Sequence, residues 1–286
     1  MRIAILILAH KNPNQLQLLV DRLQQDFDVY IHLDKKSNLS EKQFEQYPNV
    51  FCIKKYSTNW GSYNGILAPL ELFKIAGPKN YDYYIHISGQ DLPIKSNKFI
   101  TDFLNRNRSV NFVNWHRLPV NIWGEDGGFG RIRYFWEHNY GFGVIDLLKK
   151  LIIRIIRKFQ FKFNWKRKLP DMAFYGGSNW VNITGRATSI LLDYIEKHPD
   201  YLQIFKYSCN ADELWMQTVL KNAGLNLETD YLRCINWGNN RTSPNVFTMK
   251  DLDTIMAHNG LFARKFDENV DKEVIEVILQ RTENSK

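Results

Sequence analysis

The sequence contains little cysteine, and its three cysteines, Cys52, Cys209 and Cys234, stand far apart. No pair has the CxxC spacing of a zinc or redox site, and an odd number does not make a disulfide framework. No charged leader and no apolar run of membrane-spanning length precedes the strand-like run that begins at Ile3. We therefore expect a protein of a reducing cytoplasm, in a bacterium.

Motifs of several enzyme classes are also absent. The turn after the first apolar run, residues 9–13, lacks the GxGxxG of dinucleotide-binding proteins. No P-loop or nucleophile elbow occurs, and the histidines lack metal-ligand spacing. The Asp-x-Asp formed by Asp251 and Asp253 opens a predicted helix, where acidic residues complement the helix dipole, so we interpret it as structural.

The positive charge is concentrated in one segment. The formal net charge is +8, and residues 149–168 hold nine Lys or Arg and no acidic residue. Subtracting nine from +8 leaves −1 for the rest of the chain. A nucleic-acid-binding protein usually spreads its basic residues over a wider surface, so we expect no nucleic-acid partner.

Strand-like and helical patterns alternate along the first half of the chain. This alternation predicts an α/β protein with a doubly wound, mostly parallel sheet and helices on both faces, whose ligands bind beyond the carboxyl ends of the strands. We predict strands at 3–9, 29–33, 50–53, 83–87, 110–115 and 180–183, and helices at 14–27, 40–47, 64–75, 146–159, 186–197, 211–222, 251–257 and 271–281.

The segment 116–171 has a different character. Its first part, 119–143, is rich in glycine and aromatic residues without periodicity, which predicts long loops. Its predicted helix carries basic residues on one side and apolar residues on the other. This helix could lie on anionic lipid, giving a peripheral membrane contact through 146–168, or its apolar side could cover the protein's own core. The basic side has Lys150, Arg154, Arg157 and Lys158, and the apolar side Leu148, Leu151, Ile152, Ile155, Ile156 and Phe159.

Acidic residues stand where predicted strands and helices end or begin. Asp34 follows the second strand, where an acid can bind a nucleoside or simply start a turn. Asp91 follows the fourth strand and is the one carboxylate there, whereas metal-dependent nucleotide-sugar enzymes hold their metal ion with two. Asp91 could bind a donor or cap a turn. Asp212 and Glu213 open a helix, with Asn210 as a candidate cap, and dipole compensation alone would explain them.

Six blocks in the same order resemble the core-2/I-branching N-acetylglucosaminyltransferases and peptide O-xylosyltransferases. The resemblance covers residues 3–115 and 172–267, whereas 116–171 matches no block. Residues 235–237 with 243–245 look closer to the xylosyltransferases. The blocks are LAHK at 8–11, IHLDK at 31–35, ISGQDLPIK at 87–95, GGSNW at 176–180, ADELWMQT at 211–218 and LFARKFD at 261–267.

The resemblance implies a GT-A fold and an inverting displacement at a donor site without a metal or other cofactor. Glu213 aligns with the family's general base. The resemblance implies that the donor is bound by His10, Asp34, Asp91, Arg241 and Lys265, of which Arg241 and Lys265 would be the cations on the diphosphate. It implies that the acceptor is bound by Ser178, Asn179 and Trp180.

We therefore expect a single domain of residues 1–286. Residues 1–115 would form the nucleotide-sugar half, 116–171 a variable insert and 172–286 the acceptor and catalytic half. The expected reaction moves N-acetylglucosamine or xylose from a UDP-sugar to a glycan hydroxyl, including that of a lipid-linked glycan, in surface-polysaccharide synthesis at the inner face of the membrane. The alternatives are a metal-dependent nucleotide-sugar enzyme using Asp91 and a basic module that binds membrane or nucleic acid.

Overall fold

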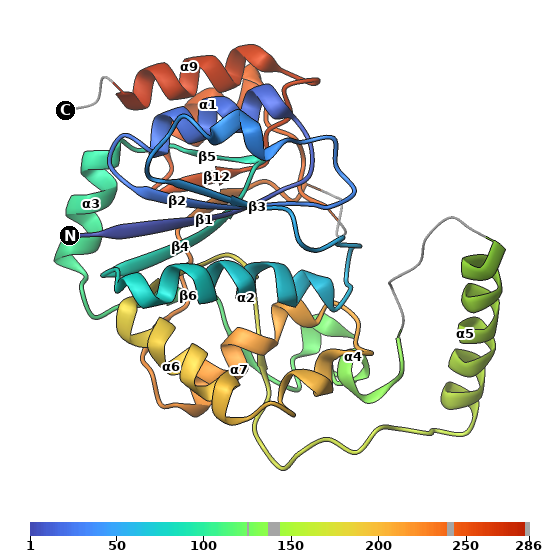
Figure 1. Cartoon of the computed structure of the whole chain (residues 1–286). Helices are drawn as coiled ribbons and strands as arrows, with labels where there is room; N and C mark the ends of the chain where they lie inside the picture. The colour runs from blue at the N-terminus through green and yellow to red at the C-terminus, as the bar shows by residue number, and fades with distance from the viewer. Residues whose placement is uncertain (125, 137–143, 239–242, 284–286) are drawn as a thin grey trace.

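The computed structural model describes residues 1–124, 126–136, 144–238 and 243–283. A seven-stranded sheet crosses the molecule in the strand order β10-β6-β9-β4-β1-β2-β3 (Figure 1). Its strands are β1 (Ile3–Ala9), β2 (Asp28–Leu33), β3 (Val50–Ile53), β4 (Tyr83–Ser88), β6 (Asn111–Val113), β9 (Val181–Thr184) and β10 (Leu227–Glu228).

One strand of this sheet runs against the others. β1 pairs in parallel with both β2 and β4, whereas β9 is antiparallel to β4 and to β6. Val113 at the end of β6 is paired with Val181 at the start of β9. The predicted doubly wound, mostly parallel sheet is confirmed, with this one reversal added.

Two hydrophobic cores lie on opposite faces of the sheet. Along β1, Ile3, Ile5 and Ile7 enter one core, and Ala4 and Leu6 enter the other, because successive side chains of a strand point to opposite faces. The first core includes residues of α1 (Pro13–Leu23), α3 (Asn97–Arg106), α8 (Leu252–Ala257) and α9 (Lys272–Glu283). The second includes residues of α2 (Asn64–Ala76), α6 (Gly185–Lys197) and α7 (Trp215–Asn222).

Short strands that the sequence pattern did not predict form two further sheets. β5 (Asp91–Pro93), β11 (Arg233–Ile235) and β12 (Phe262–Arg264) form a sheet in the order β11-β12-β5. β7 (His116–Arg117) pairs with β8 (Tyr175–Gly176). Strands of two or three residues are too short to show an alternation of polar and apolar residues. The register of the three-stranded sheet places Arg264 opposite Asp91.

Two predicted helices differ from the expectation. The helix predicted at 211–222 is broken: residues 211–213 form a separate 3-10 turn, Leu214 has φ −125°, and α7 begins at Trp215. The capping role expected of Asn210 is wrong, because this residue has φ 50° and its side chain makes no capping hydrogen bond. The helix predicted at 40–47 is a 3-10 turn, Glu41–Phe44. Asp251 closes a capping box with Thr248, which confirms its structural interpretation.

The segment predicted as long loops contains a short helix, α4 (Gly130–Arg133), and is followed by α5 (Val144–Lys162). Figure 1 shows α5 standing beside the body of the molecule. Leu151, Ile155 and Phe159 on its apolar side are exposed, so the alternative that this side covers the protein's own core is wrong. Among the described residues no helix is both long and apolar enough to cross a membrane.

Candidate functional site

Two adjoining cavities open at the carboxyl ends of the parallel strands. The first, which we call the strand-end cavity, has about 490 Å³ and is lined by His10 after β1, Asp34 after β2 and Ser88 at the end of β4. The second, the carboxylate cavity, has about 850 Å³ and is lined by Glu213 and Lys265. Five residues line both cavities and so join them into one site: Trp60, Asn179, Trp180, Asp212 and Arg264.

Asp34 lines the strand-end cavity and fixes the loops around it. Its carboxylate accepts hydrogen bonds from the backbone N–H of Lys36 at 2.8 Å and of Thr58 at 2.9 Å, and from the Thr58 hydroxyl. Burial by itself would raise the pKa of Asp34, but these hydrogen bonds outweigh it and lower the pKa. The carboxylate therefore stays ionised at neutral pH and holds the two loops together at the end of β2.

Asp91 lies beneath the site. Its side chain is fully buried, and its Oδ1 accepts a hydrogen bond from the Arg264 guanidinium at 2.6 Å. The Ser88 hydroxyl and backbone N–H also donate to this carboxylate. Within the described ranges no three His, Cys, Asp or Glu side chains lie where they could hold a metal ion together. The positive partner of Asp91 is the protein's own Arg264.

Arg264 is the residue that sequence reasoning missed. Besides its bond to Asp91, its guanidinium donates to the Ser88 hydroxyl and lies 4.4 Å from the ring centre of Trp180. It lines both cavities, so a fixed positive charge stands where they meet. A signal was present, because Arg264 precedes Lys265 in the last of the six blocks.

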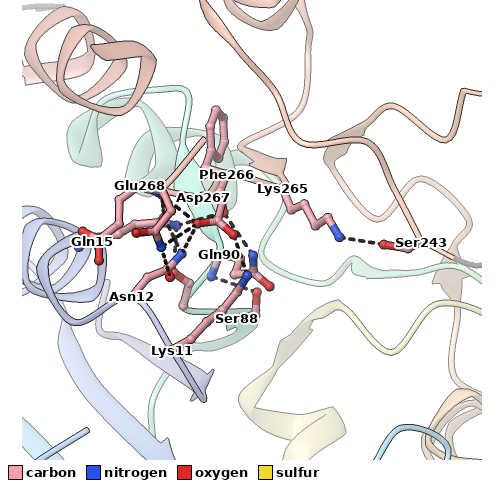
Figure 2. Close-up of polar contacts among 12 residues, drawn as sticks. Lys11, Asn12, Gln15, Ser88, Gln90, Ser243, Lys265, Phe266, Asp267 and Glu268 are labelled. Carbon is pink, nitrogen blue, oxygen red and sulfur yellow. Dashed lines mark hydrogen bonds and ion pairs between the residues drawn. The ribbon is translucent and has the colours of Figure 1, made fainter. Parts of the chain in front are cut away.

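Lys265 projects into the carboxylate cavity and donates a hydrogen bond to the Ser243 hydroxyl at 2.6 Å (Figure 2). Burial lowers the pKa of Lys265, and the positive charges of Arg264 and Lys11 lower it further. Cations held close together repel one another, so this part of the cavity favours an anionic ligand. Arg241, the other predicted cation, lies outside the described residues.

The chain that follows Lys265 is anchored to the segment after β1. Figure 2 shows Asp267 surrounded by Lys11, Asn12 and Gln15. Its carboxylate accepts from Lys11 at 2.5 Å and from Asn12 at 3.0 Å. Burial opposes ionisation here, but the hydrogen bonds from Lys11 and Asn269 hold the pKa of Asp267 to about 2. These contacts fix the position from which Lys265 reaches into the cavity.

Glu213 is held by an arginine from the segment that matched no family block. Nη1 of Arg131, in α4, lies 2.5 Å from Oε2 of Glu213, whose side chain remains 37% exposed to the cavity. The guanidinium of Arg131 also lies 3.8 Å from the ring centre of Trp123. The backbone carbonyl of Glu213 accepts from the N–H of Gly177 at 2.8 Å. The carboxylate is thus both oriented and accessible, as a general base must be.

The neighbouring Asp212 has a different environment. Burial, together with the negative charge of Glu213, raises the pKa of Asp212 to about 7. Its side chain packs against the start of α2, where a Cβ added to Gly65 would lie 3.7 Å from that of Asp212. Of the two adjacent carboxylates, the more enclosed one is thus partly protonated near neutral pH.

The predicted acceptor residues line the carboxylate cavity as a group. The Ser178 hydroxyl accepts from the Trp180 N–H at 3.3 Å, and the Asn179 carbonyl is hydrogen-bonded to His86. Gly177 permits this geometry, since a Cβ there would lie 2.0 Å from a backbone oxygen of Asn114. The site brings Ser178, Asn179 and Trp180 together with Glu213 and Lys265.

Two asparagines of the cavity wall, Asn179 and Asn210, have buried side-chain oxygens. Oδ1 of Asn179 and Oδ1 of Asn210 have no hydrogen-bond partner within the part of the chain that the structure describes. Both residues line the carboxylate cavity. A buried acceptor without a partner costs about 1–3 kcal/mol. Neither position was singled out for this reason by sequence reasoning.

Comparisons with known proteins find a family model and several relatives that the chain resembles. Residues 3–125 match the family model described as Core-2/I-Branching enzyme. The chain is 26% identical over 96% of its length to a xylosyltransferase of Ciona intestinalis. It is also 26% identical over 97% of its length to xylosyltransferase 2 of Mus musculus, and over 96% to xylosyltransferase 1 of Homo sapiens. The chain spans about a third of these curated relatives, 33%, 33% and 30% of their lengths respectively.

Proposed function

We propose that the chain, whose residues 3–125 match the core-2/I-branching enzyme family model, is a glycosyltransferase that moves a sugar from a UDP-sugar to a hydroxyl group of a glycan. The observation that carries this proposal is a single cavity lined by an accessible carboxylate, Glu213, and by two cations, Arg264 and Lys265. A base for the acceptor and positive charge for the leaving group are the two requirements of the reaction.

The proposed step is a direct displacement with inversion. Glu213 takes the proton of the acceptor hydroxyl while the hydroxyl oxygen bonds to the anomeric carbon of the donor. The bond from that carbon to the UDP oxygen breaks, and its electron pair stays on the diphosphate. The new negative charge is stabilised by Lys265 and Arg264, with Arg241 as a further candidate.

We propose that no metal ion takes part. In a metal-dependent site, carboxylates would hold the ion that bridges the diphosphate. Here the one candidate carboxylate at the end of β4, Asp91, is already bonded to Arg264, which faces both cavities. The role of Asp91 in donor binding is then to hold this arginine in place, and a guanidinium suits phosphate oxygens through its paired N–H groups.

The strand-end cavity is the proposed site of the nucleoside, next to His10 and Asp34. The acceptor would lie on the other side of Trp180, near Ser178 and Asn179. Xylose is the first candidate for the transferred sugar because the relatives named above are xylosyltransferases. N-acetylglucosamine is the second, from the family model, and surface-polysaccharide synthesis is the proposed setting.

The test is a panel of UDP-sugars, including UDP-xylose and UDP-N-acetylglucosamine, assayed for UDP release with and without glycan acceptors. The proposal expects release with one or two donors and loss of release in Glu213→Gln. A requirement for Mn²⁺ would favour the metal-dependent alternative using Asp91. No binding of any UDP-sugar, measured by calorimetry, would contradict the proposal and favour a binding module.

A further inference from the structure

Helix α5 contacts the body of the protein with its polar side. The Arg157 guanidinium lies 4.3 Å from the ring centre of Trp136, and the Gln160 side-chain amide exchanges two hydrogen bonds with the backbone of Phe135, at 2.9 and 3.0 Å. Phe161 packs on Tyr134 with ring centres 4.4 Å apart. These contacts set the rotation of α5 about its own axis.

The opposite side of α5 is apolar and faces solvent. At 100° per residue, seven apolar residues fall within one arc of about 140°, the width of an amphipathic face. Each remains between 38% and 69% exposed. We call this surface the α5 apolar face; it consists of Ile145, Leu148, Leu151, Ile152, Ile155, Ile156 and Phe159.

Basic residues border this face on both edges, and residues 147–168 contain no acid. Lys149 and Lys158 lie next to the two edges of the arc on the helical wheel. Arg154, Arg157 and Lys158 line a cavity of about 650 Å³ that also reaches Leu151 and Ile155. After the helix, Phe163 and Trp165 are 61% and 59% exposed. Aromatic and basic residues around an apolar face are typical of helices that lie at a lipid headgroup boundary.

We propose that α5 binds the surface of an anionic phospholipid bilayer. The helix lies in the plane of the surface, with the α5 apolar face in the outer acyl region and the basic residues on lipid phosphates. Charge favours lipid over a second copy of the chain, because pairing two such faces would bring Arg154, Arg157 and Lys158 of the two copies together, and residues 147–168 contain no acidic residue. The inference does not depend on the proposed function.

The connections of α5 place the bound surface near the site. The chain enters the segment from α4, which carries the Arg131 partner of Glu213, and returns to β8 directly before the acceptor residues. Attachment through α5 would therefore tether the carboxylate cavity to the lipid surface through these two connections.

The experiment is sedimentation of the full chain with vesicles of phosphatidylcholine alone or with a third of phosphatidylglycerol, at low and high salt. We expect binding to the anionic vesicles at low salt and weaker binding at high salt, because salt screens the charges. The double variant Leu151→Glu/Ile155→Glu should lower the partition coefficient at least about tenfold. Val270→Glu, at an exposed apolar position outside α5, is the matched control and should bind as the wild type does.

A second pair of variants tests the charges without touching the α5 apolar face. Arg154→Gln and Lys158→Gln should each lower binding to anionic vesicles about fivefold, which corresponds to the usual contribution of one basic residue. Lys98→Gln, at an exposed lysine of α3, is the control. All of these positions are exposed, so the thermal unfolding midpoints should stay unchanged.

Three outcomes would overturn the proposal. The first is failure of the wild type to sediment with anionic vesicles at low salt, and the second is a loss of binding in Val270→Glu as strong as in the double variant. The third outcome is a dimer of the wild type in light scattering that becomes a monomer in the double variant, with no vesicle binding. That result would assign the α5 apolar face to contact between two copies of the chain.

Discussion

Arg131 and Glu213 form an ion pair with 2.5 Å between Nη1 and Oε2, although 82 positions separate them in the chain. Arg131 comes from α4, within the segment 116–171 that matched no family block, whereas Glu213 belongs to the block assigned to the general base. The position of the proposed base therefore depends on a part of the chain that the family resemblance does not cover.

Glu213→Gln should lower turnover by about two to four orders of magnitude, because the amide keeps the size of the side chain but cannot accept the acceptor's proton. UDP affinity, measured by calorimetry, should change little. Glu228→Gln, an exposed position on β10, is the control. Turnover close to wild type in Glu213→Gln would remove this residue from the role of base.

Arg131→Met should lower turnover by about one to two orders of magnitude, since a displacement of about 1 Å in a catalytic group can have an effect of that size. UDP affinity should again stay near wild type, while Arg131→Lys should recover part of the activity. A loss of UDP binding in Arg131→Met would instead place Arg131 on the donor side.

Lys265→Ala should weaken UDP binding about tenfold or more, because a charge-assisted hydrogen bond contributes about 1.5–3 kcal/mol. The loss should be smaller at high salt. Arg241→Ala, outside the described residues, should act in the same direction. Lys250→Ala removes an exposed lysine and is the control. If Lys265→Ala binds UDP as the wild type does, the cation on the diphosphate must be sought elsewhere.

Excess EDTA should leave the transfer activity unchanged, because the proposed charge on the diphosphate comes from Arg264 and Lys265. The measurement is UDP release before and after chelation, with Mn²⁺ added back. Loss of activity on chelation and recovery with Mn²⁺ would contradict the two-cation model and make Asp91 the candidate ligand.

Asp212→Asn should reduce the loss of stability that the wild type shows as the pH rises. The pKa of Asp212 is raised to about 7 in the folded state, so the folded protein binds more protons than the unfolded chain between pH 4 and 7. The wild type accordingly loses stability as the pH rises through this window, by up to about 4 kcal/mol from this one group. The free energy of unfolding, measured in urea at pH 4 and pH 8, should show this loss reduced in Asp212→Asn. Asp253→Asn, an exposed position on α8, should follow the wild type.

Long strands and helices could be predicted from the sequence because their side chains repeat with a clear period. β1 is predicted with the bounds that it has, and α2 differs by one residue. β5, β11 and β12 could not be predicted in this way, since three residues carry no period and their pairing joins segments far apart in the chain.

The same limit applies to the candidate site. Asp34, Glu213 and Lys265 could be named from local blocks, and the structure brings them to two adjoining cavities. Arg264 and Arg131 acquire their places through tertiary contacts, with Asp91 and Glu213 respectively. Arg264 could have been noted because it stands in the last of the six blocks. An ion pair between distant segments leaves no local pattern in one sequence, so the pairing of each arginine with its carboxylate appears only when the fold is known.

The reversed strand β9 brings the two ends of the middle of the chain, residues 114–180, side by side. β6 ends at Val113, which is paired with Val181 at the start of β9. The residues between them, 114–180, therefore form an excursion that leaves the sheet and returns to it at the same place. Changes of length in the loops of this excursion need not alter the pairing of β6 with β9, whereas Leu118, Ile132 and Phe174 within it are buried in the second core. Its return path supplies Asn179 and Trp180, and its outward path supplies Arg131. Exchange of this excursion between related proteins could therefore change acceptor preference and surface attachment together. Residues 1–115, the proposed nucleotide-sugar half, could stay the same.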